Sequence, residues 1–205
     1  MLKKNIKSFF KAVKAVKAGD LELVKTLYAE IPDLVNTCSI SPPKKDDGQS
    51  PLHIAYKTGN YEVANFLISK GADVNFIEDS SINEWNAPVI HDCIRGVAFN
   101  TYSLTENEES FEAALNALKN IIENGASVNS EDSYGNSCLG RAILDTRQII
   151  SREFSDEVST IVYSQYRALF RVLLEAGADL EVKTERRPSA IELIERAQLH
   201  KYNLV

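Results

Sequence analysis

Two central histidines are the residues of this sequence that most readily suggest chemistry. His53 and His91 carry imidazoles that exchange protons near neutral pH, and Cys93 stands two residues after His91. Residues two apart on a helix point away from each other, so Cys93 and His91 are not expected to form the nucleophile and base of a covalent mechanism. A structural role is the alternative for both histidines.

The acidic run of Glu106, Glu108 and Glu109 is a second candidate, because paired carboxylates act as acid and base. The same residues are favoured at the N-terminus of a helix, where the helix dipole stabilises negative charge, and we expect a helix to begin there. The sequence holds no GxGxxG, GxxxxGK[ST], HExxH or GxSxG motif. We therefore predict no enzymatic activity, no cofactor and no metal site.

The cysteines and the hydropathy indicate a compartment. Cys38, Cys93 and Cys138 are odd in number, widely spaced and without a CxxC pair, which argues against a disulfide framework or a structural zinc site. No apolar stretch approaches the roughly 20 residues that span a bilayer, and the first residues lack the features of a signal peptide. We expect a soluble, cytoplasmic protein with no stable membrane insertion.

Charge is distributed unevenly along the chain. Its 205 residues include 23 basic and 29 acidic side chains, a net charge of −6. Residues 46–135 carry four basic and fifteen acidic residues, whereas residues 1–45 carry nine and four. The net negative charge argues against nucleic-acid binding, and the acidic centre favours a protein partner with a basic surface.

Residues 47–75, DGQSPLHIAYKTGNYEVANFLISKGADVN, have the pattern of two short antiparallel helices. Ser50 suits an N-cap and Pro51 the first helical position, where its missing N–H costs nothing. Gly59 ends the first helix, and Gly71 stands where the second helix needs a left-handed residue. One such pair cannot bury its own apolar faces, so further copies are required.

This segment closely resembles the ankyrin repeat, and degraded copies cover the rest of the chain. They are AVKAGDLELVKTL (15–27), NAPVIHDC (86–93), IIENGASVN (121–129), GNSCLGRA (135–142), LLEAGADL (173–180) and SAIELI (189–194). The resemblance implies an all-α fold, an ankyrin-repeat solenoid of stacked antiparallel helix pairs joined by turns. It makes residues 1–205 a single domain with units of approximately 1–36, 37–75, 76–129, 130–180 and 181–205.

The resemblance also implies structural roles for the repeated residues. The histidine of the repeat ties one turn to its neighbour, which is the role implied for His53 and His91, and the closing asparagine ties adjacent turns, which is implied for Asn75 and Asn129. The expected structural residues of the repeat are Ser50, Pro51, His53, Gly59, Gly71, Asn75, His91, Gly125, Asn129 and Gly177.

Two units exceed the ~33 residues of the repeat. Relative to residues 47–75, the third unit has 16 extra residues between Cys93 and Ile121, and the fourth has 19 between Ala142 and Leu173. Their apolar residues keep helical spacing, so we expect two elongated hairpins that pack against each other. A Thr105–Glu108 capping box and Ser155 are the expected starts of their outer helices.

The elongated hairpins leave alternatives open. Their apolar residues are extra core in one interpretation, and in another the projecting pairs form a second wall for a partner. A third interpretation is an enzyme or ligand-binding protein that uses a cleft between the hairpins, near Asp145, Arg147, Arg152 and Glu153.

The turns between units are the expected partner-binding surface, because ankyrin proteins usually bind through these turns and the concave inner surface. We place the turns at approximately 37–48, 76–86, 130–136 and 183–187, with Pro42 and Pro43 stiffening the first into a projection. Aromatic residues are enriched at interface hot spots, and carboxylates steer cationic partners. The predicted partner-binding residues are Phe76, Glu78, Asp79, Glu84, Trp85, Glu131, Asp132 and Tyr134.

The N-terminal segment reads as a basic amphipathic helix with Lys3, Lys7, Lys11 and Lys14 on one face. Such a helix can lie on an anionic membrane or contact nucleic acid, but a terminal repeat also needs a polar outer face. We favour the capping role, keep surface attachment as an alternative, and expect a monomer.

Overall fold

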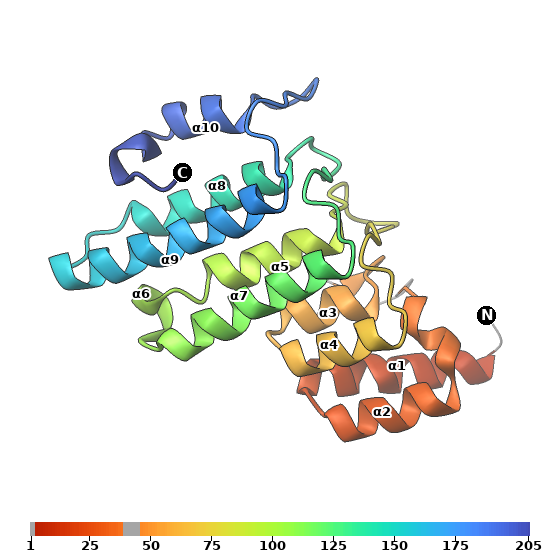
Figure 1. Ribbon diagram of the computed structural model, residues 1–205. Coiled ribbons are helices and arrows are strands. Elements are labelled where there is room, and N and C mark those ends of the chain that lie inside the picture. Colours follow the sequence, from red (N-terminus) through yellow and green to blue (C-terminus); the bar gives the residue numbers. More distant parts are fainter. Residues whose placement is uncertain (1–2, 39–45) are drawn as a thin grey trace.

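The computed structural model describes residues 3–38 and 46–205, and this part of the chain is helical (Figure 1). Pairs of antiparallel helices stack side by side, as predicted. The helices are α1 (Lys3–Ala18), α2 (Leu21–Glu30), η1 (Pro32–Asn36), α3 (Pro51–Lys57), α4 (Tyr61–Ser69), α5 (Val89–Ala98), α6 (Tyr102–Thr105), α7 (Glu108–Glu123), α8 (Cys138–Ile150), α9 (Asp156–Glu175), α10 (Ala190–Arg196) and η3 (Leu199–Tyr202). The projection predicted at Pro42 and Pro43 lies outside the described residues.

The second helix pair forms as its sequence predicts. The Ser50 hydroxyl accepts a hydrogen bond from the His53 backbone N–H at 3.4 Å, and Pro51 occupies the first turn of α3. Gly71 lies two residues after Ser69, the last residue of α4, and has a φ of 83°, a left-handed conformation that residues with a Cβ rarely adopt. These features end each helix where the chain must turn back.

The inner helices form the continuous spine of the stack. Helix α1 packs on α3, α3 on α5, α5 on α8, and α8 on α10, while α2, α4, α7 and α9 lie on the outer side. Side chains from every pair are buried between them, among them Val16, Leu52, Ile90, Leu139 and Leu169. Because each pair buries its faces against its neighbours, the core is a row of layers rather than one centre.

Three asparagines join consecutive units by the same pair of hydrogen bonds. Asn75 donates to the Gly125 carbonyl at 2.9 Å and accepts from the Ser127 N–H at 2.8 Å. Asn129 does the same with the Gly177 carbonyl and the Asp179 N–H, and Asn36 with the corresponding groups of the second unit. The predicted ties through Asn75 and Asn129 are therefore confirmed, and Asn36 adds a third.

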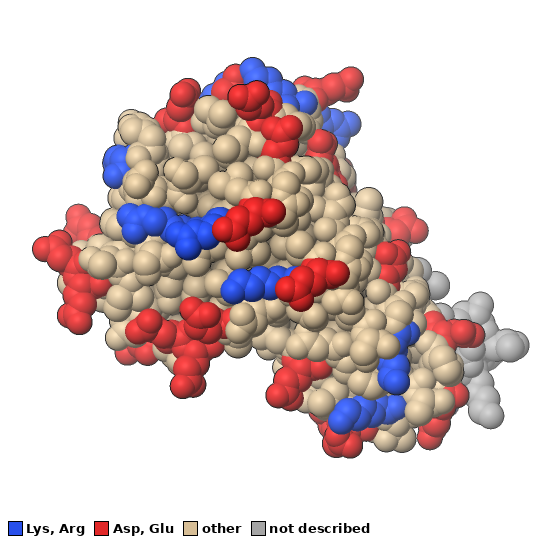
Figure 2. Space-filling view, in the orientation of Figure 1, with Lys and Arg blue, Asp and Glu red and all other residues tan. Residues whose placement is uncertain are grey.

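The elongated hairpins pack against each other as expected. The outer helices α7 and α9 have 16 and 20 residues, against 9 for α4. Both α6 and α7 contact α9, and the buried Gln165 side chain accepts a hydrogen bond from the Tyr102 N–H at 2.9 Å. In Figure 2 acidic side chains gather at the distal ends of these hairpins, where α7 and α9 begin.

One predicted helix start is wrong and one is confirmed. Ser155 caps α9 through the Val158 N–H, as predicted. Helix α7 is capped by Asn107, which accepts from the Glu109 N–H at 2.8 Å, rather than by Thr105. Thr105 instead ends the short helix α6, and Glu106 after it adopts a left-handed φ of 52° that separates the two helices.

The N-terminal helix buries its apolar face in the stack. Phe9, Val13 and Val16 of α1 are buried, while Lys7, Lys11 and Lys14 are exposed. The side chain of Lys3 lies outside the described residues. An apolar face that is already packed is not free to enter a lipid surface, which supports the capping role.

Candidate functional site

A groove runs along the inner side of the stack, over α3, α5 and the turn that precedes α5. It consists of two neighbouring hollows of about 450 Å³ each, which have Lys57 and Trp85 as common lining residues. We call it the inner groove. Its main lining residues are Gln49, Tyr56, Lys57, Tyr61, Glu78, Ile82, Glu84, Trp85, Asp92, Arg95, Phe99, Asn100 and Tyr134.

Trp85 stands at the junction of the two hollows and is half-buried. Its indole N–H donates to the Asp132 carboxylate at 2.8 Å, and the Arg95 guanidinium lies 5.8 Å from the centre of its ring. Arg95 also lies 6.0 Å from the ring of Phe99. The indole is thus held on two sides while the remaining part of its surface lines the groove.

The structure divides the predicted partner-binding residues into exposed and buried sets. Four of them are exposed on the turns: Asp79, Glu84, Glu131 and Tyr134. Phe76 and Trp85 are half-buried, and Phe76 packs edge-on against His53 with ring centres 5.8 Å apart. Glu78 and Asp132 are buried, so the prediction that they are exposed partner contacts is wrong for these two carboxylates.

Asp132 is buried because it organises its own turn. Its carboxylate accepts hydrogen bonds from the backbone N–H groups of Tyr134 and Asn136, from the Asn136 side chain and from Trp85. Burial favours the protonated form of Asp132, but the hydrogen bonds from Asn136 and Trp85 outweigh it and lower its pKa. This carboxylate is a structural element of the turn.

Glu78 has an equivalent role in the preceding turn. Its side chain accepts from the Gln49 side-chain amide and from the Ala87 N–H, the latter at 3.1 Å. Burial raises the pKa of Glu78, and these two hydrogen bonds partly oppose that rise. Since both oxygens are engaged inside the protein, Glu78 anchors the turn from residue 78 to residue 87.

The two histidines tie neighbouring turns together, as the sequence predicts. His53 Nε2 donates to the Ala87 carbonyl at 3.2 Å, and His91 Nε2 donates to the Ser130 carbonyl at 3.4 Å. Burial lowers the pKa of each to about 4, so both imidazoles are neutral at pH 7. Their position in the core leaves no place for a substrate beside them.

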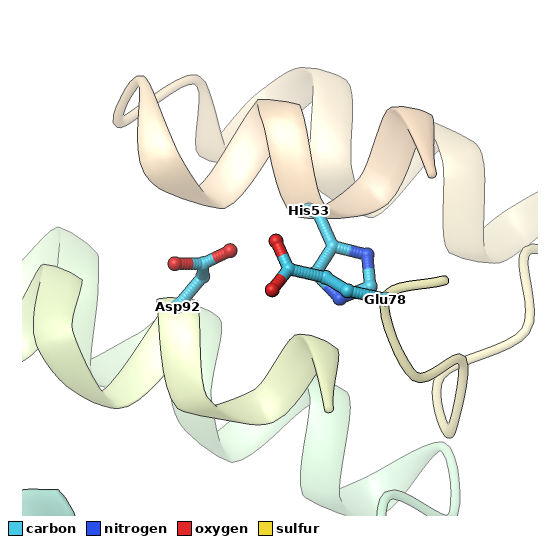
Figure 3. A group of neighbouring side chains, drawn as sticks. All are labelled: His53, Glu78 and Asp92. Carbon is cyan, nitrogen blue, oxygen red and sulfur yellow. The ribbon is translucent and has the colours of Figure 1, made fainter. Parts of the chain in front are cut away.

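His53, Glu78 and Asp92 lie between α3 and α5, and potential metal-ligand atoms from the three side chains are within 4.8 Å of one another (Figure 3). Both nitrogens of His53 are already engaged, Nε2 with Ala87 and Nδ1 with the Ser50 hydroxyl at 2.9 Å. Both oxygens of Glu78 are engaged as well. An ion could therefore bind His53 only by displacing one of that residue's hydrogen bonds.

Asp92 is the unusual member of this group. It is 6% exposed and lines the inner groove, and among the described residues its carboxylate has no hydrogen bond and no ion pair within 4.0 Å. Burial and the nearby Glu78 carboxylate raise the pKa of Asp92 to about 7. Asp92 is not among the predicted partner-binding residues, although a charged residue within the otherwise uncharged run VIHDCI is a signal that the sequence offers.

The alternative site between the elongated hairpins is not assembled as expected. Asp145 is fully buried in a bidentate pair with Arg141, with N–O distances of 3.1 and 2.7 Å. Arg147, Arg152 and Glu153 instead line a separate hollow of about 650 Å³ between the end of α8, the start of α9 and η3. The apolar residues of the hairpins belong to the core: Ile149 and Ile150 are buried, and Phe99, Leu104, Phe154 and Val158 are partly buried against it.

The fold is a helical repeat solenoid with a groove on its inner side. Residues 11–84 match a family model described as ankyrin repeats (3 copies), and the described helices form the stack expected of an ankyrin solenoid. The chain is similar to the ankyrin repeat protein FPV244 of Fowlpox virus (strain NVSL), with 33% identity over 46% of this chain and 15% of the relative. It is also similar to an ankyrin repeat protein of Rickettsia felis, with 27% identity over 67% of this chain and 47% of the relative.

The chain thus spans less than half the length of each of these curated relatives. Ankyrin repeats generally mediate protein–protein interaction, through the extended concave surface that stacked repeats create. Among the described residues, no helix combines the length and apolar character needed to cross a bilayer.

Proposed function

We propose that this chain is a non-catalytic module that binds a partner protein with a basic surface, through the inner groove and the exposed tips of the adjacent turns. The observation that carries the proposal is the inner groove around Trp85, with exposed carboxylates nearby. Glu84 lines the groove, and Asp79 and Glu131 are exposed on the adjacent turns. Carboxylates at the edge of a groove accelerate encounter with a cationic partner and select against acidic ones.

Apolar side chains beside these carboxylates supply contact area. Ile77, Ile82 and Tyr134 are 52%, 50% and 40% exposed, which is high for large apolar residues. Burial of such side chains at a complex contributes roughly 25 cal/mol per Å² of apolar surface removed from water. An acidic rim around apolar contacts is the arrangement expected where charge steers a partner and apolar burial retains it.

The site suits binding better than catalysis. Both histidines are buried and neutral, and Cys93 and Cys138 are buried thiols whose pKa values are raised by burial. A buried, protonated thiol is a poor nucleophile. The free cysteines support the expected cytoplasmic location, and a monomer remains the expected state.

The test uses charge reversal at exposed positions only. Wild-type protein and a Glu84→Lys/Glu131→Lys variant are used to capture partners from the native lysate, and affinities of the captured protein are then measured with purified components. Neither side chain carries a hydrogen bond within the described residues, so the variant should fold normally. We expect binding to weaken by at least roughly tenfold.

A Glu62→Lys/Glu123→Lys variant is the matched control. It changes the net charge equally at exposed positions of the outer helices α4 and α7. The control should bind like the wild type. Equal capture by the groove variant and the wild type would show that the partner does not use this rim.

A further inference from the structure

The floor of the inner groove holds a pair of buried carboxylates. Glu78 reaches from the turn and Asp92 from α5, and the two approach each other between α3 and α5 (Figure 3). Each is less than a tenth exposed, and oxygens of the two carboxyl groups lie within 4.8 Å. Bringing two carboxylates together away from water is unfavourable unless positive charge compensates it.

Two described cations that act on Asp92, Lys57 and Arg95, make their closest printed contacts with other groups. Lys57 Nζ donates to the Gln49 side chain at 3.2 Å, and Arg95 stacks on Trp85 and Phe99 with its Nε 3.8 Å from Asp145. Neither forms an ion pair within 4.0 Å of Glu78 or Asp92 among the described residues. Glu78 is stabilised by its two hydrogen bonds, so Asp92 is the group left to be compensated.

Aromatic side chains line the hollow that contains Asp92, together with Lys57 and Arg95. Tyr61, Trp85 and Phe99 line the same hollow as Asp92, which has a volume of about 450 Å³. Aromatic faces attract cations through their quadrupoles, and the packing of Arg95 on two of these rings shows that they accept a cation. A buried carboxylate beside aromatic rings is suited to an organic cation. The carboxylate pairs with the charged group of the cation, and the rings contact its apolar part.

We propose that this hollow receives a basic side chain, Lys or Arg, of the partner protein, whose charged group pairs with the Asp92 carboxylate. The inference rests on the proposed function and adds to it the position and the chemistry of an anchoring contact. A metal ion is the less suitable occupant, since both nitrogens of His53 already have hydrogen-bond partners and only two carboxylates would be left as ligands.

Binding should depend on pH because only the ionised Asp92 pairs with a cation. Ionisation of Asp92 is opposed by burial, by Glu78 and by Asp145, and favoured by Lys57 and Arg95. Its pKa of about 7 places the change within the physiological range. The charged and titratable groups of the packed elements that surround it are His53 and Lys57 of α3, Glu78 of the turn, Arg95 of α5, and Arg141 and Asp145 of α8.

The experiment uses the single tryptophan of the chain, which stands in the wall of this hollow. The indole N–H signal of Trp85 is followed by NMR during titration with N-acetyl-lysine methylamide, N-acetyl-arginine methylamide and the uncharged N-acetyl-norleucine methylamide. We expect saturable shifts with the two cations, roughly tenfold weaker binding in Asp92→Asn, and no change in Glu62→Gln on the outer helix. Affinity of the wild type should rise between pH 6 and pH 8.

Several outcomes would overturn the proposal. They are the absence of a response to both cations, an equal response in Asp92→Asn, or a response to the norleucine compound of the same size. Parallel titrations with CaCl2 and ZnCl2 test for a metal site. An Asp92-dependent shift at a lower concentration of metal than of either organic cation would identify a metal ion as the occupant and contradict the proposal. The pH titration of the wild type tests the same prediction without any variant.

Failure of this inference differs from failure of the proposed function. A partner that loses affinity for Glu84→Lys/Glu131→Lys but binds Asp92→Asn as tightly as the wild type uses the groove without this anchor. A partner that binds the charge-reversal variant unchanged contradicts the proposed function, whatever the small cations do. Loss of affinity in both variants supports both proposals.

Discussion

The Trp85 indole donates a hydrogen bond to the Asp132 carboxylate at 2.8 Å, and this contact joins two consecutive turns of the stack. Asp132 also accepts bonds from Tyr134 and Asn136 in its own turn. One carboxylate therefore fixes both the shape of its turn and the orientation of the groove tryptophan. The same contact explains why Asp132, although it lies in a turn, is not available to a partner.

Replacement of Asp132 by Ala should destabilise the protein by roughly 2 to 4 kcal/mol, since four donors lose their acceptor. It should also release Trp85, with a red shift of its fluorescence as the indole gains water. Urea denaturation followed by fluorescence measures both effects. An Ala variant as stable as the wild type, with unchanged emission, would show that the turn does not need this carboxylate.

Replacement of Asn75 by Ala should cost about 1 to 2 kcal/mol, because two hydrogen bonds between the second and third units are lost. Asn116→Ala on the exposed surface of α7 is the control, and it should leave stability within about 0.5 kcal/mol. Chemical denaturation of both variants gives the comparison. An equal loss of stability in Asn75→Ala and Asn116→Ala would mean that the hydrogen bonds of Asn75 between the units contribute no more to stability than an exposed asparagine does.

The buried histidines should make the protein less stable in acid. Burial lowers the pKa of His53 and His91 from 6.5 to about 4, so the unfolded chain takes up protons that the folded chain resists. Stability should therefore fall as pH decreases from 6.5 towards 4. Denaturation across this range tests the sign, and a His91→Gln variant should show a shallower fall than the wild type.

Asp92 should act in the opposite direction. Its pKa is raised from 3.8 to about 7, so the unfolded chain ionises first and stability decreases as pH rises through this window. Asp92→Asn should be more stable than the wild type at pH 8, by roughly 2 to 4 kcal/mol, and similar to it at pH 4. Lower stability of the Asn variant at pH 8 would indicate that a cation within the chain already compensates Asp92.

Arg141→Ala should cost roughly 3 to 5 kcal/mol, because it leaves the fully buried Asp145 carboxylate without its bidentate partner. The double variant Arg141→Met/Asp145→Leu removes both charges and should recover most of that loss. Thermal denaturation of the three proteins measures the coupling. A double variant no more stable than Arg141→Ala would show that the loss arises from packing rather than from an unpaired charge.

The sequence predicts most of the fold because its repeat signals are local. Ser50, Pro51 and Gly71 each act within one turn of their own helix, so their consequences can be read from neighbouring residues. The burial of the Glu78 and Asp132 side chains could not be predicted from neighbouring residues. Each of them accepts a hydrogen bond from a residue far away in the sequence, 29 positions from Glu78 and 47 positions from Asp132. Asp92 was missed for the same reason: the groove above it is built by three separate segments.

The elongated hairpins change how the stack can bend. The outer helices of the first two units, α2 and α4, have 10 and 9 residues, whereas the outer helices α7 and α9 of the next two units have 16 and 20. A wider contact resists flexing more strongly, so we expect curvature to vary mainly in the narrow half. The inner groove crosses the step between the two widths, and small changes of curvature there would open or close it around a partner.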